Sequence, residues 1–382
     1  MARAKKEVKA GQVSIADMRK MLNKKHGQSV AWDLTGDNNP TEVKEWIPTG
    51  SRWLDSIISR GKRAGIPVGK ITEIAGLEAT GKSYMAAQIA ANAQRQGIGV
   101  VYFDAESAID PEFLAAAGCD LENVLYIQAQ SVEFVLETME DLLASASEKL
   151  LFIWDSLALT PSITDVEGDF NPLSSMAVKP RILSKGMSKL VQPIANAKAT
   201  LLVLNQLKPN ITNNMAEKLT TPYFTPGGKA MSYSYSLRIW LTGRKAKASF
   251  IVDDKGYRIG SEVKVKLEKS RFGTAGRQCG FKILWGDEVG VQDEESWFEA
   301  IKSSDHLVNV GNQFKLLFKD GSEKKFYAKN WMVELQDEAF RTRVMEVMDE
   351  EIITKFKNRD GDADVFYALE DERDEEEKKS LS

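Results

Sequence analysis

Short apolar runs alternate with segments of helical periodicity between residues 46 and 288. Some runs are apolar at nearly every position, which is typical of strands buried on both faces of a parallel sheet. These runs cover residues 99–104, 124–128, 150–155 and 200–204. Apolar residues recur with helical spacing near residues 83–95, 111–117, 131–147 and 181–196. The alternation predicts an α/β fold with a mostly parallel central sheet flanked by helices.

The pattern changes toward the C-terminus. Later apolar segments predict further strands, which we expect to extend the sheet in antiparallel fashion; they lie at 236–241, 261–267 and 280–284. Beyond residue 290 the pattern predicts a small α+β domain. Its expected elements are a helix at 296–302, strands at 313–318 and 324–328 around a turn at 319–322, and a helix at 340–356.

A short amphipathic helix is predicted at residues 14–26, outside the core. Ser14 is a suitable N-cap, and helical spacing is followed by Ile15, Met18, Met21 and Leu22. The apolar stripe of an isolated terminal helix needs a partner, which is either its own core or a neighbouring subunit. We therefore divide the chain into an N-terminal segment (1–45), a core (46–288), a C-terminal domain (289–358) and a tail (359–382).

The composition is that of an ordinary globular protein, because 43% of the 382 residues are hydrophobic and 28% are charged. No run approaches 18 apolar residues, and the N-terminus lacks the apolar core of a secretory signal. We therefore expect no membrane span and no secretion. Cys119 and Cys279 lie far apart and predict free thiols in a reducing cytoplasm. His26 and His306 are too few for a zinc site.

The net charge of −4 conceals an asymmetry between the ends of the chain. Residues 1–25 carry eight basic residues against two acidic ones, whereas residues 360–382 carry ten acidic residues against three basic ones. So charged a tail cannot bury a core, and we expect it to be disordered. The tail either increases solubility or acts as an internal polyanion that competes with nucleic acid for a basic surface.

Residues 76–83 fit the phosphate-loop pattern G-x-x-x-x-G-K-[ST], between an apolar strand and an Ala-rich helix. Gly76 and Gly81 let the backbone curl so that its N–H groups point at an anion. Lys82 can reach the outer phosphates, and the Ser83 hydroxyl can bind Mg²⁺. The positive end of the following helix faces the same phosphates. The alternative is a glycine turn that binds no ligand.

Two predicted strands end in acids at the edge where open α/β sheets bind ligands. Asp155 ends the run 150–155, and we expect it on the strand next to the phosphate-loop strand, beside Ser83, where it holds Mg²⁺. The alternative is a helix cap. Glu106 follows the run 99–104 and can orient and polarise the water that attacks a γ-phosphate. The alternative is that Asp104 or Glu106 caps a loop.

Another predicted strand ends in Asn205 and Gln206. An amide can hydrogen-bond a γ-phosphate without adding charge, and Gln206 leads into a long segment, 207–226, that we predict to be free of strands. An amide sensor joined to a mobile loop is a candidate switch. This segment and a second one at 165–179 mix basic and apolar residues, which suits a nucleic-acid backbone with spread bases. The alternative is a pair of solvated loops.

Together these segments resemble the bacterial RecA recombinases across residues 46–288, and weakly beyond. The order and spacing match at residues 76–83, 103–111, 153–156, 204–206 and 227–231. Residues 268–271 (Glu-Lys-Ser-Arg) and departures in both loops resemble a diverged member of the family, such as the phage UvsX recombinases. The resemblance implies a RecA-type P-loop ATPase core, an N-terminal oligomerisation helix and a small α+β C-terminal domain.

The resemblance also implies a role for each matching residue. ATP is expected to contact Gly76, Leu77, Glu78, Ala79, Thr80, Gly81, Lys82, Ser83 and Tyr84, and its adenine Asp110, Phe113 and Trp285. Mg²⁺ is expected on Ser83 and Asp155. Catalysis is assigned to Lys82, Glu106 and Gln206, with Lys269 and Arg271 reaching in from a neighbouring subunit. DNA binding is assigned to Phe170, Met176, Lys179, Arg181, Lys189, Lys208, Asn210, Asn213, Gly227 and Gly228.

The function implied is ATP-dependent strand exchange in a bacterial or phage-infected cytoplasm, at the nucleoid. Subunits polymerise as a helical filament on single-stranded DNA, with ATP at the subunit interface, and pair it with double-stranded DNA while hydrolysing ATP to ADP and phosphate. Single-strand-binding and mediator proteins are allowed as further partners, and a membrane is not expected. The alternatives are a RecA-fold ring motor such as a helicase, or a regulatory ATP-binding module without strand exchange. Closed rings and open helices are separable by electron microscopy.

Overall fold

The computed structural model describes residues 13–27, 29–34, 41–168, 178–212, 214–243, 249–286 and 289–354. They belong to two compact units that divide after Lys44. Each unit is considered by itself. The predicted tail at 359–382 lies outside the described residues. None of the helices in these ranges is both long and apolar enough to cross a bilayer.

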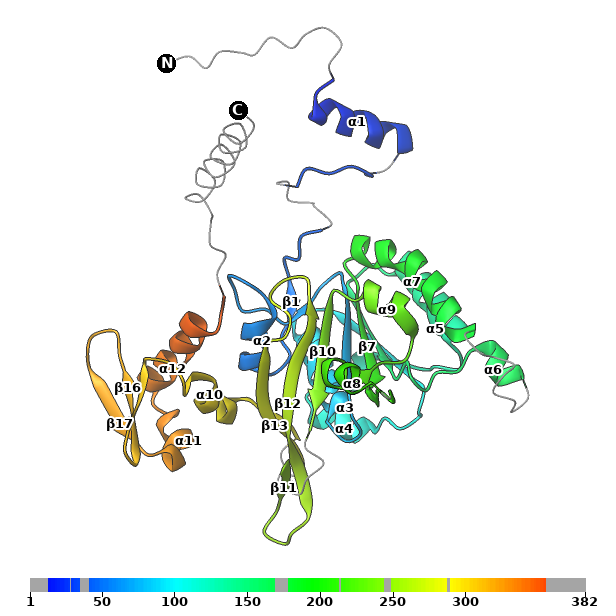
Figure 1. The fold of residues 1–382 in the computed structure, drawn as a ribbon. Helices are drawn as coiled ribbons and strands as arrows, with labels where there is room; N and C mark the ends of the chain where they lie inside the picture. Colours follow the sequence, from blue (N-terminus) through cyan, green and yellow to red (C-terminus); the bar gives the residue numbers. More distant parts are fainter. Residues whose placement is uncertain are drawn as a thin grey trace, which may run out of the picture. The chain divides into compact units, whose positions relative to one another are not determined.

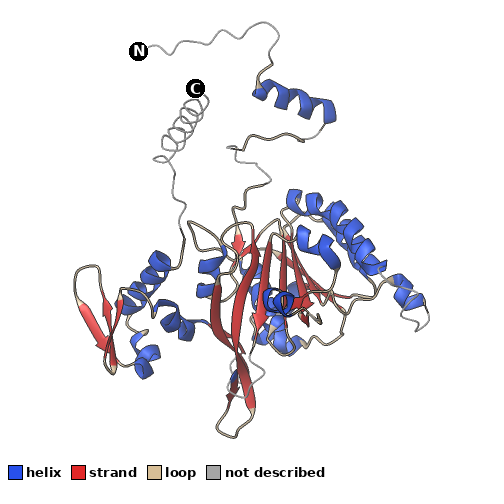
Figure 2. Ribbon diagram, in the orientation of Figure 1, coloured by secondary structure: helices blue, strands red, loops and turns tan. Residues whose placement is uncertain are grey.

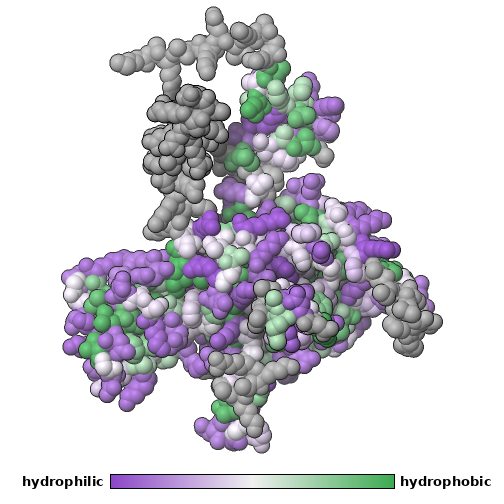
Figure 3. Space-filling view, in the orientation of Figure 1, coloured by the Kyte–Doolittle hydropathy of each residue, from purple (hydrophilic) through white to green (hydrophobic). Residues whose placement is uncertain are grey.

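The first unit contains the predicted N-terminal helix, α1 (Ile15–His26). Ser14 caps it by accepting a hydrogen bond from the Asp17 N–H at 3.1 Å, as predicted, and Gly27 ends it with φ = 65°. No residue of α1 is buried, and its large apolar side chains are visible as green surface in Figure 3. The helix therefore presents an apolar face that its own unit leaves uncovered.

The second unit is built on one large sheet with the order β14-β13-β12-β10-β3-β7-β6-β4-β5, and with β11 paired to β12 (Figures 1 and 2). The parallel part contains β3 (Ile71–Gly76), β4 (Gly99–Asp104), β5 (Val124–Gln128), β6 (Leu150–Asp155), β7 (Thr200–Gln206) and β10 (Leu237–Thr242). The antiparallel part contains β11 (Phe250–Val252), β12 (Arg258–Ser270), β13 (Gln278–Trp285) and β14 (Val289–Gln292). The predicted parallel sheet is confirmed, and so is the antiparallel extension at β12 and β13. For segment 236–241 the expectation was wrong, because β10 pairs parallel with β3.

Helices cover both faces of the parallel strands, which is why a strand such as β6 is apolar at every position from residue 150 to 154. Along β6, Leu151 and Ile153 pack in the core that contains α3 (Lys82–Arg95), whereas Phe152 and Trp154 pack in the core with α5 (Val132–Ser145) and α7 (Val178–Asn196). The remaining elements of this half are short: α2 (Arg52–Ile58), α4 (Pro111–Ala116), α6 (Ile163–Glu167), α9 (Gly228–Ser234), a 3-10 turn (Leu121–Asn123), and the pair β1 (Trp46–Ile47) and β2 (Ile66–Pro67).

The C-terminal part confirms the predicted α+β pattern. It contains α10 (Asp293–Ile301), β15 (Leu307–Val310), β16 (Gln313–Leu317), β17 (Glu323–Phe326), a 3-10 turn (Ala328–Asn330), α11 (Trp331–Glu334) and α12 (Glu338–Glu351). The β16–β17 hairpin turns at Gly321, whose φ of 85° suits glycine. A cluster of aromatic rings forms its core: Phe298, Phe314, Phe326, Trp331 and Phe340.

The prediction that residues 207–226 contain no strand is wrong. β8 (Lys208–Pro209) pairs with β9 (Tyr223–Phe224), and α8 (Met215–Thr220) lies between them. Asn214 caps α8 by accepting from the N–H groups of Ala216 and Glu217. Strands of two residues carry no readable periodicity, so local pattern could not reveal them.

A buried acid lies where α2 meets the C-terminal part. Asp55 is buried and accepts hydrogen bonds from Thr49 through its N–H (3.2 Å) and its hydroxyl (2.7 Å). Burial raises the pKa of Asp55 to about 7, and the nearby Asp293 adds to the shift. Since an unfolded Asp has a pKa of about 3.9, the folded chain holds a proton that the unfolded chain has released.

This proton makes stability depend on pH. The contribution of Asp55 is present in full below about pH 4 and is lost as the pH rises through about 7. Asp55→Asn stays neutral, so we expect the fall of Tm between pH 5 and pH 8 to be shallower and the Tm at pH 8 to exceed that of the unaltered chain. Thermal unfolding followed by circular dichroism measures this. Asp141→Asn, at an exposed position on α5, is the control, and equal pH profiles for D55N and the unaltered chain would refute the assignment.

Candidate nucleotide site

The phosphate loop joins β3 to α3 at the carboxyl edge of the sheet. Gly81 is the N-cap of α3 and adopts φ = 81°. A Cβ on Gly76 would lie 2.4 Å from the Thr80 Oγ1, and one on Gly81 would lie 2.6 Å from the Ile283 Cδ1, so neither position tolerates a side chain. Thr80 closes the loop by donating to the Leu77 carbonyl at 2.8 Å. The N–H groups and positive end of α3 are thereby fixed for an anion.

Lys82 folds back over this loop. Its Nζ donates to the carbonyls of Gly76 (3.3 Å) and Leu77 (3.0 Å). Burial lowers the pKa of Lys82, while the carboxylates of Asp155 and Glu106 act in the opposite direction. The ammonium is therefore held at the loop among acids, in the position from which it can meet phosphate oxygens.

Asp155 meets Ser83 as predicted, although β7 lies between their strands. We expected β6 to be next to β3, and this detail is wrong, because the sheet order is β3-β7-β6. Ser83 bridges the gap from the first turn of α3: its Oγ donates to the Asp155 Oδ2 at 3.0 Å, and the Tyr102 hydroxyl donates to the same oxygen at 2.9 Å. Burial raises the pKa of Asp155, and these two hydrogen bonds oppose that rise.

These groups fit a magnesium ion. A serine hydroxyl and a carboxylate oxygen at contact distance are hard oxygen ligands, which Mg²⁺ prefers. Asp155 caps no helix here, since its Oδ2 is used by Ser83 and Tyr102. Ser83 and Asp155 are the residues that could hold the ion.

The two acids at the end of β4, Asp104 and Glu106, have different roles. Asp104 is buried and accepts the backbone N–H groups of residues 106–109, so it is the loop cap. Glu106 is exposed, and its Oε1 accepts a hydrogen bond from the Ser156 Oγ at 3.2 Å. Ser156 directly follows Asp155, so the Glu106 carboxylate is positioned at the same edge of the sheet, free of a capping role.

Gln206 ends β7 directly opposite Gly76 in the parallel ladder. The next residue, Leu207, donates its N–H to the Gly76 carbonyl at 3.0 Å. The long segment 207–226 therefore starts at the first residue of the phosphate loop. Gln206 is therefore close to the phosphate loop, as the predicted role of a phosphate sensor requires.

Two of the residues predicted to contact the base, Phe113 and Trp285, lie against the same ring, that of Tyr84. The Phe113 ring packs edge-on against Tyr84 (4.4 Å between centroids), and Tyr84 lies 5.8 Å from Trp285. Asp110 is the N-cap of α4, accepting from the Glu112 N–H at 2.8 Å. Tyr84 was expected to bind ATP, and its ring lies between those of Phe113 and Trp285.

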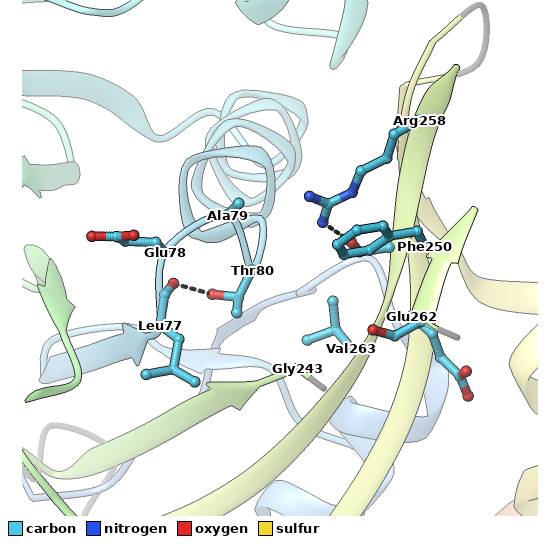
Figure 4. Close-up of a pocket in the computed structure, with 11 residues that line it drawn as sticks. Leu77, Glu78, Ala79, Thr80, Gly243, Phe250, Arg258, Glu262 and Val263 are labelled. Carbon is cyan, nitrogen blue, oxygen red and sulfur yellow. Dashed lines mark hydrogen bonds between the residues drawn. The ribbon is translucent and has the colours of Figure 1, made fainter. Parts of the chain in front are cut away.

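A pocket of about 250 Å³ lies on the β10–β12 side of the phosphate loop (Figure 4). Across it, Phe250 and Arg258 face Ala79 and Thr80. The Arg258 guanidinium lies over the rings of Phe250 (3.9 Å) and Trp285 (5.0 Å). Sequence reasoning missed Arg258, because an arginine on a hairpin strand carries no local sign that it stacks beside a phosphate loop.

Lys269 and Arg271 lie at the other end of the sheet. β12 runs antiparallel to β10, so Lys269 is opposite Arg238, and Arg238 is opposite Glu73, three residues before Gly76. The Lys269 Nζ donates to the carbonyls of Ser232 (2.8 Å) and Tyr233 (3.3 Å), and Arg271 donates to that of Tyr233 (3.0 Å). The structure does not bring this pair to the phosphate loop of its own chain.

The predicted DNA-binding residues are arranged as follows. Lys179 is half-buried and donates to the carbonyls of Leu157 (2.7 Å) and Ala158 (3.1 Å); burial lowers the pKa of Lys179 to about 8. Arg181 and Lys208 are exposed, Asn210 donates to the Thr221 carbonyl, and Lys189 pairs with Glu140 at 2.5 Å. Gly227 and Gly228 both have positive φ and approach Leu157 and Pro180. Phe170, Met176 and Asn213 lie outside the described residues.

Comparison with known proteins gives a consistent result. The model of the RecA N-terminal domain matches residues 13–290. Protein RecA of Fusobacterium nucleatum subsp. nucleatum is 31% identical over 309 residues, which cover 81% of this chain and 76% of that protein. The match spans every residue of the site described above.

The position of Lys82 predicts a binding defect. Lys82→Ala removes the ammonium that the loop carbonyls hold, and one charged hydrogen bond to phosphate contributes about 1.5–3 kcal/mol. We expect the Kd for a fluorescent ATP analogue to rise at least about tenfold. Lys149→Ala, at the amino end of β6, is the control. An unchanged Kd for K82A would rule out the phosphate-loop assignment.

Proposed function

The chain belongs to the RecA family, and we propose that it is an ATP-dependent recombinase that forms helical filaments on single-stranded DNA and catalyses homologous pairing. One observation carries the proposal: Lys269 and the nearby Arg271 lie at the end of the sheet opposite the phosphate loop of the same chain. In our proposal the nucleotide site has two halves. Lys82, Ser83, Glu106, Asp155 and Gln206 form one half. Lys269 and Arg271 form the other, and they complete the site only for a neighbouring subunit.

The distances along the strands support this separation. Lys269 is in register with Glu73, and from Glu73 to Gly76 the strand advances roughly 10 Å at 3.3 Å per residue. The phosphate loop extends beyond Gly76, away from Lys269. The Lys269 side chain, which binds the carbonyls of Ser232 and Tyr233, cannot also reach the phosphate loop of its own chain. An ATP molecule at the interface would then join one subunit to the next.

Each residue of the first half has a chemical task in this proposal. Lys82 and the N–H groups of the loop bind the phosphates of ATP. Mg²⁺ on Ser83 and Asp155 neutralises phosphate charge when bound. Glu106, held by Ser156, orients the attacking water and accepts its proton. Gln206 reports the γ-phosphate to segment 207–226, which we propose binds DNA together with the segment before α7.

Two surfaces support polymerisation. β5 is the edge strand of the large sheet, and Leu125 and Tyr126 on it are exposed. An edge strand with exposed apolar residues is a template for pairing with another chain. The uncovered apolar face of α1 is a second such surface. A head-to-tail contact between different surfaces forms an open helix unless its rotation closes a ring.

The proposal is tested by ATPase rates with and without single-stranded DNA, beside electron micrographs of the same samples and a D-loop assay. We expect stimulated hydrolysis, helical filaments and paired product. Closed rings would instead identify a motor of the helicase type. Filaments that fail to form D-loops would identify a regulatory ATP-binding module.

Glu106 provides a test of the chemical step. Glu106→Gln keeps the hydrogen bond from Ser156 but removes the base, so we expect hydrolysis to slow by about 10²–10⁴-fold while ATP affinity stays unchanged. Asp104→Asn is the comparison, because it disturbs the loop cap rather than the base. Turnover of E106Q at the normal rate would exclude Glu106 as the base.

The shared site predicts complementation between two inactive variants. Glu106→Gln lacks the base, and the double variant Lys269→Ala/Arg271→Ala lacks the trans cations. In a random 1:1 mixture about a quarter of head-to-tail interfaces combine an intact base with intact cations, so we expect DNA-stimulated ATPase near a quarter of normal. Each variant alone sets the background. A mixture no more active than its components would contradict a site shared between subunits.

A further inference from the structure

A carboxylate lies fully buried in the strand that leads to the phosphate loop. Glu73, in the middle of β3, has no exposed side-chain surface, and its partner Arg238 on β10 is 12% exposed. The Arg238 Nε donates to the Glu73 Oε2 at 2.6 Å, and the Asn205 Nδ2 donates to the Glu73 Oε1 at 3.0 Å. Both carboxylate oxygens are therefore held, one from each neighbouring strand.

Stability alone does not account for this arrangement. Removing two charges from water costs several kcal/mol per ion, and a well-packed apolar replacement of a buried pair is often as stable or more stable. The neighbouring positions on β3, Ile74 and Ala75, are apolar and fully buried, so the strand could bury an apolar residue here as well. The question is what the pair holds in place.

The same three residues hold the end of segment 207–226. The Arg238 NH2 group donates to the Thr225 Oγ1 at 2.9 Å, and the Asn205 Nδ2 donates to the Pro226 carbonyl at 2.9 Å. The segment thus begins at Gly76, through the N–H of Leu207, and ends at Glu73. Both of its ends are attached to β3, three residues apart, and the second attachment runs through a charged network.

Asn205 joins the two attachments. Its Oδ1 accepts the backbone N–H of Gln206 at 3.0 Å, while its Nδ2 contacts both Glu73 and Pro226. A shift of Gln206 at the phosphate loop therefore acts on the residue that also fixes the far end of the segment. Buried polar networks with every member satisfied are stiff and transmit displacement.

We infer that Glu73 and Arg238 are positioning residues that couple the DNA-binding segment 207–226 to the phosphate loop, through Thr225, Asn205 and Pro226. The inference rests on the proposed function. In this role the pair touches neither nucleotide nor DNA. The pair transmits conformational changes of segment 207–226 to β3, and conformational changes of β3 to the segment.

A second connection leads from the network to the trans cations. α9 follows Pro226 directly, with Gly227 as its N-cap, and Lys269 and Arg271 hold the carbonyls of Ser232 and Tyr233 at its other end. Arg238 and Lys269 are opposite each other on β10 and β12. The Glu73–Arg238 pair is therefore positioned to influence whether the Lys269 side chain keeps its hydrogen bonds to Ser232 and Tyr233 of its own chain.

Thr225→Val is the sharpest test, because valine matches threonine in shape and removes only the oxygen that accepts from Arg238. The buried pair itself stays intact. We expect ATP affinity and DNA-free ATPase to be unchanged and the stimulation by single-stranded DNA to fall about fivefold or more, within the range of typical coupling energies. Thr221→Val, in the same segment at an exposed position, is the matched control.

Thermodynamic reciprocity between ATP and DNA binding provides a measurement that would not change if Thr225 only stabilised the fold. If DNA raises ATP affinity less in T225V, then ATP must raise DNA affinity less by the same factor. Fluorescence anisotropy with a labelled oligonucleotide, with and without a non-hydrolysable ATP analogue, measures this. An equal loss of DNA affinity in both states would identify Thr225 as a plain DNA contact and overturn the inference.

The pair is tested by replacing both charges together. Glu73→Gln with Arg238→Met leaves no unpaired charge, so we expect the Tm to be maintained while DNA stimulation is lost. Normal stimulation in this variant, or in T225V, would overturn the inference and leave the proposed function intact. An unaltered chain whose ATPase does not respond to DNA would overturn the proposed function, and the inference with it.

Discussion

The structure depends on the way β3 is held between β7 and β10. Parallel neighbours on both sides fix the register of Gly76 against Gln206 and Leu241, so the phosphate loop leaves the sheet at one defined point. The apolar faces of the sheet pack against helices on both sides, which makes this point rigid. A loop that must hold phosphate through backbone N–H groups needs such a rigid base, because a small shift of the base moves every donor.

The direction of the strands then decides the chemistry available to one chain. Parallel strands β4, β6 and β7 deliver Glu106, Asp155 and Gln206 to the edge where the loop begins. β12 runs the other way, so Lys269 near its end and Arg271 just after it lie at the opposite edge. In the function we propose, this single reversal is what makes polymerisation necessary for catalysis, since no chain completes its own site.

A second consequence follows from the buried polar groups of β3. Glu73 is fully buried, and its charge is tolerable only because Arg238 and Asn205 satisfy it. The same two residues bind Thr225 and Pro226. The groups that neutralise and satisfy the buried Glu73 therefore also attach the end of segment 207–226 to the sheet. The coupling that we infer between DNA and nucleotide thus uses groups that the fold cannot leave unpaired.

The sequence by itself determined the local features. Unbroken apolar runs predicted the buried strands, glycine and lysine spacing predicted the phosphate loop, and Ser14 predicted the start of α1, because each depends on neighbours within a few residues. Tertiary structure alone decided that Asp104 caps the loop while Glu106 remains available, and that β7 separates β6 from β3. It also decided that Lys269 lies far from its own phosphate loop and that Glu73 meets Arg238, 165 residues away. These outcomes depend on strand order, register and burial, which no short window of sequence contains.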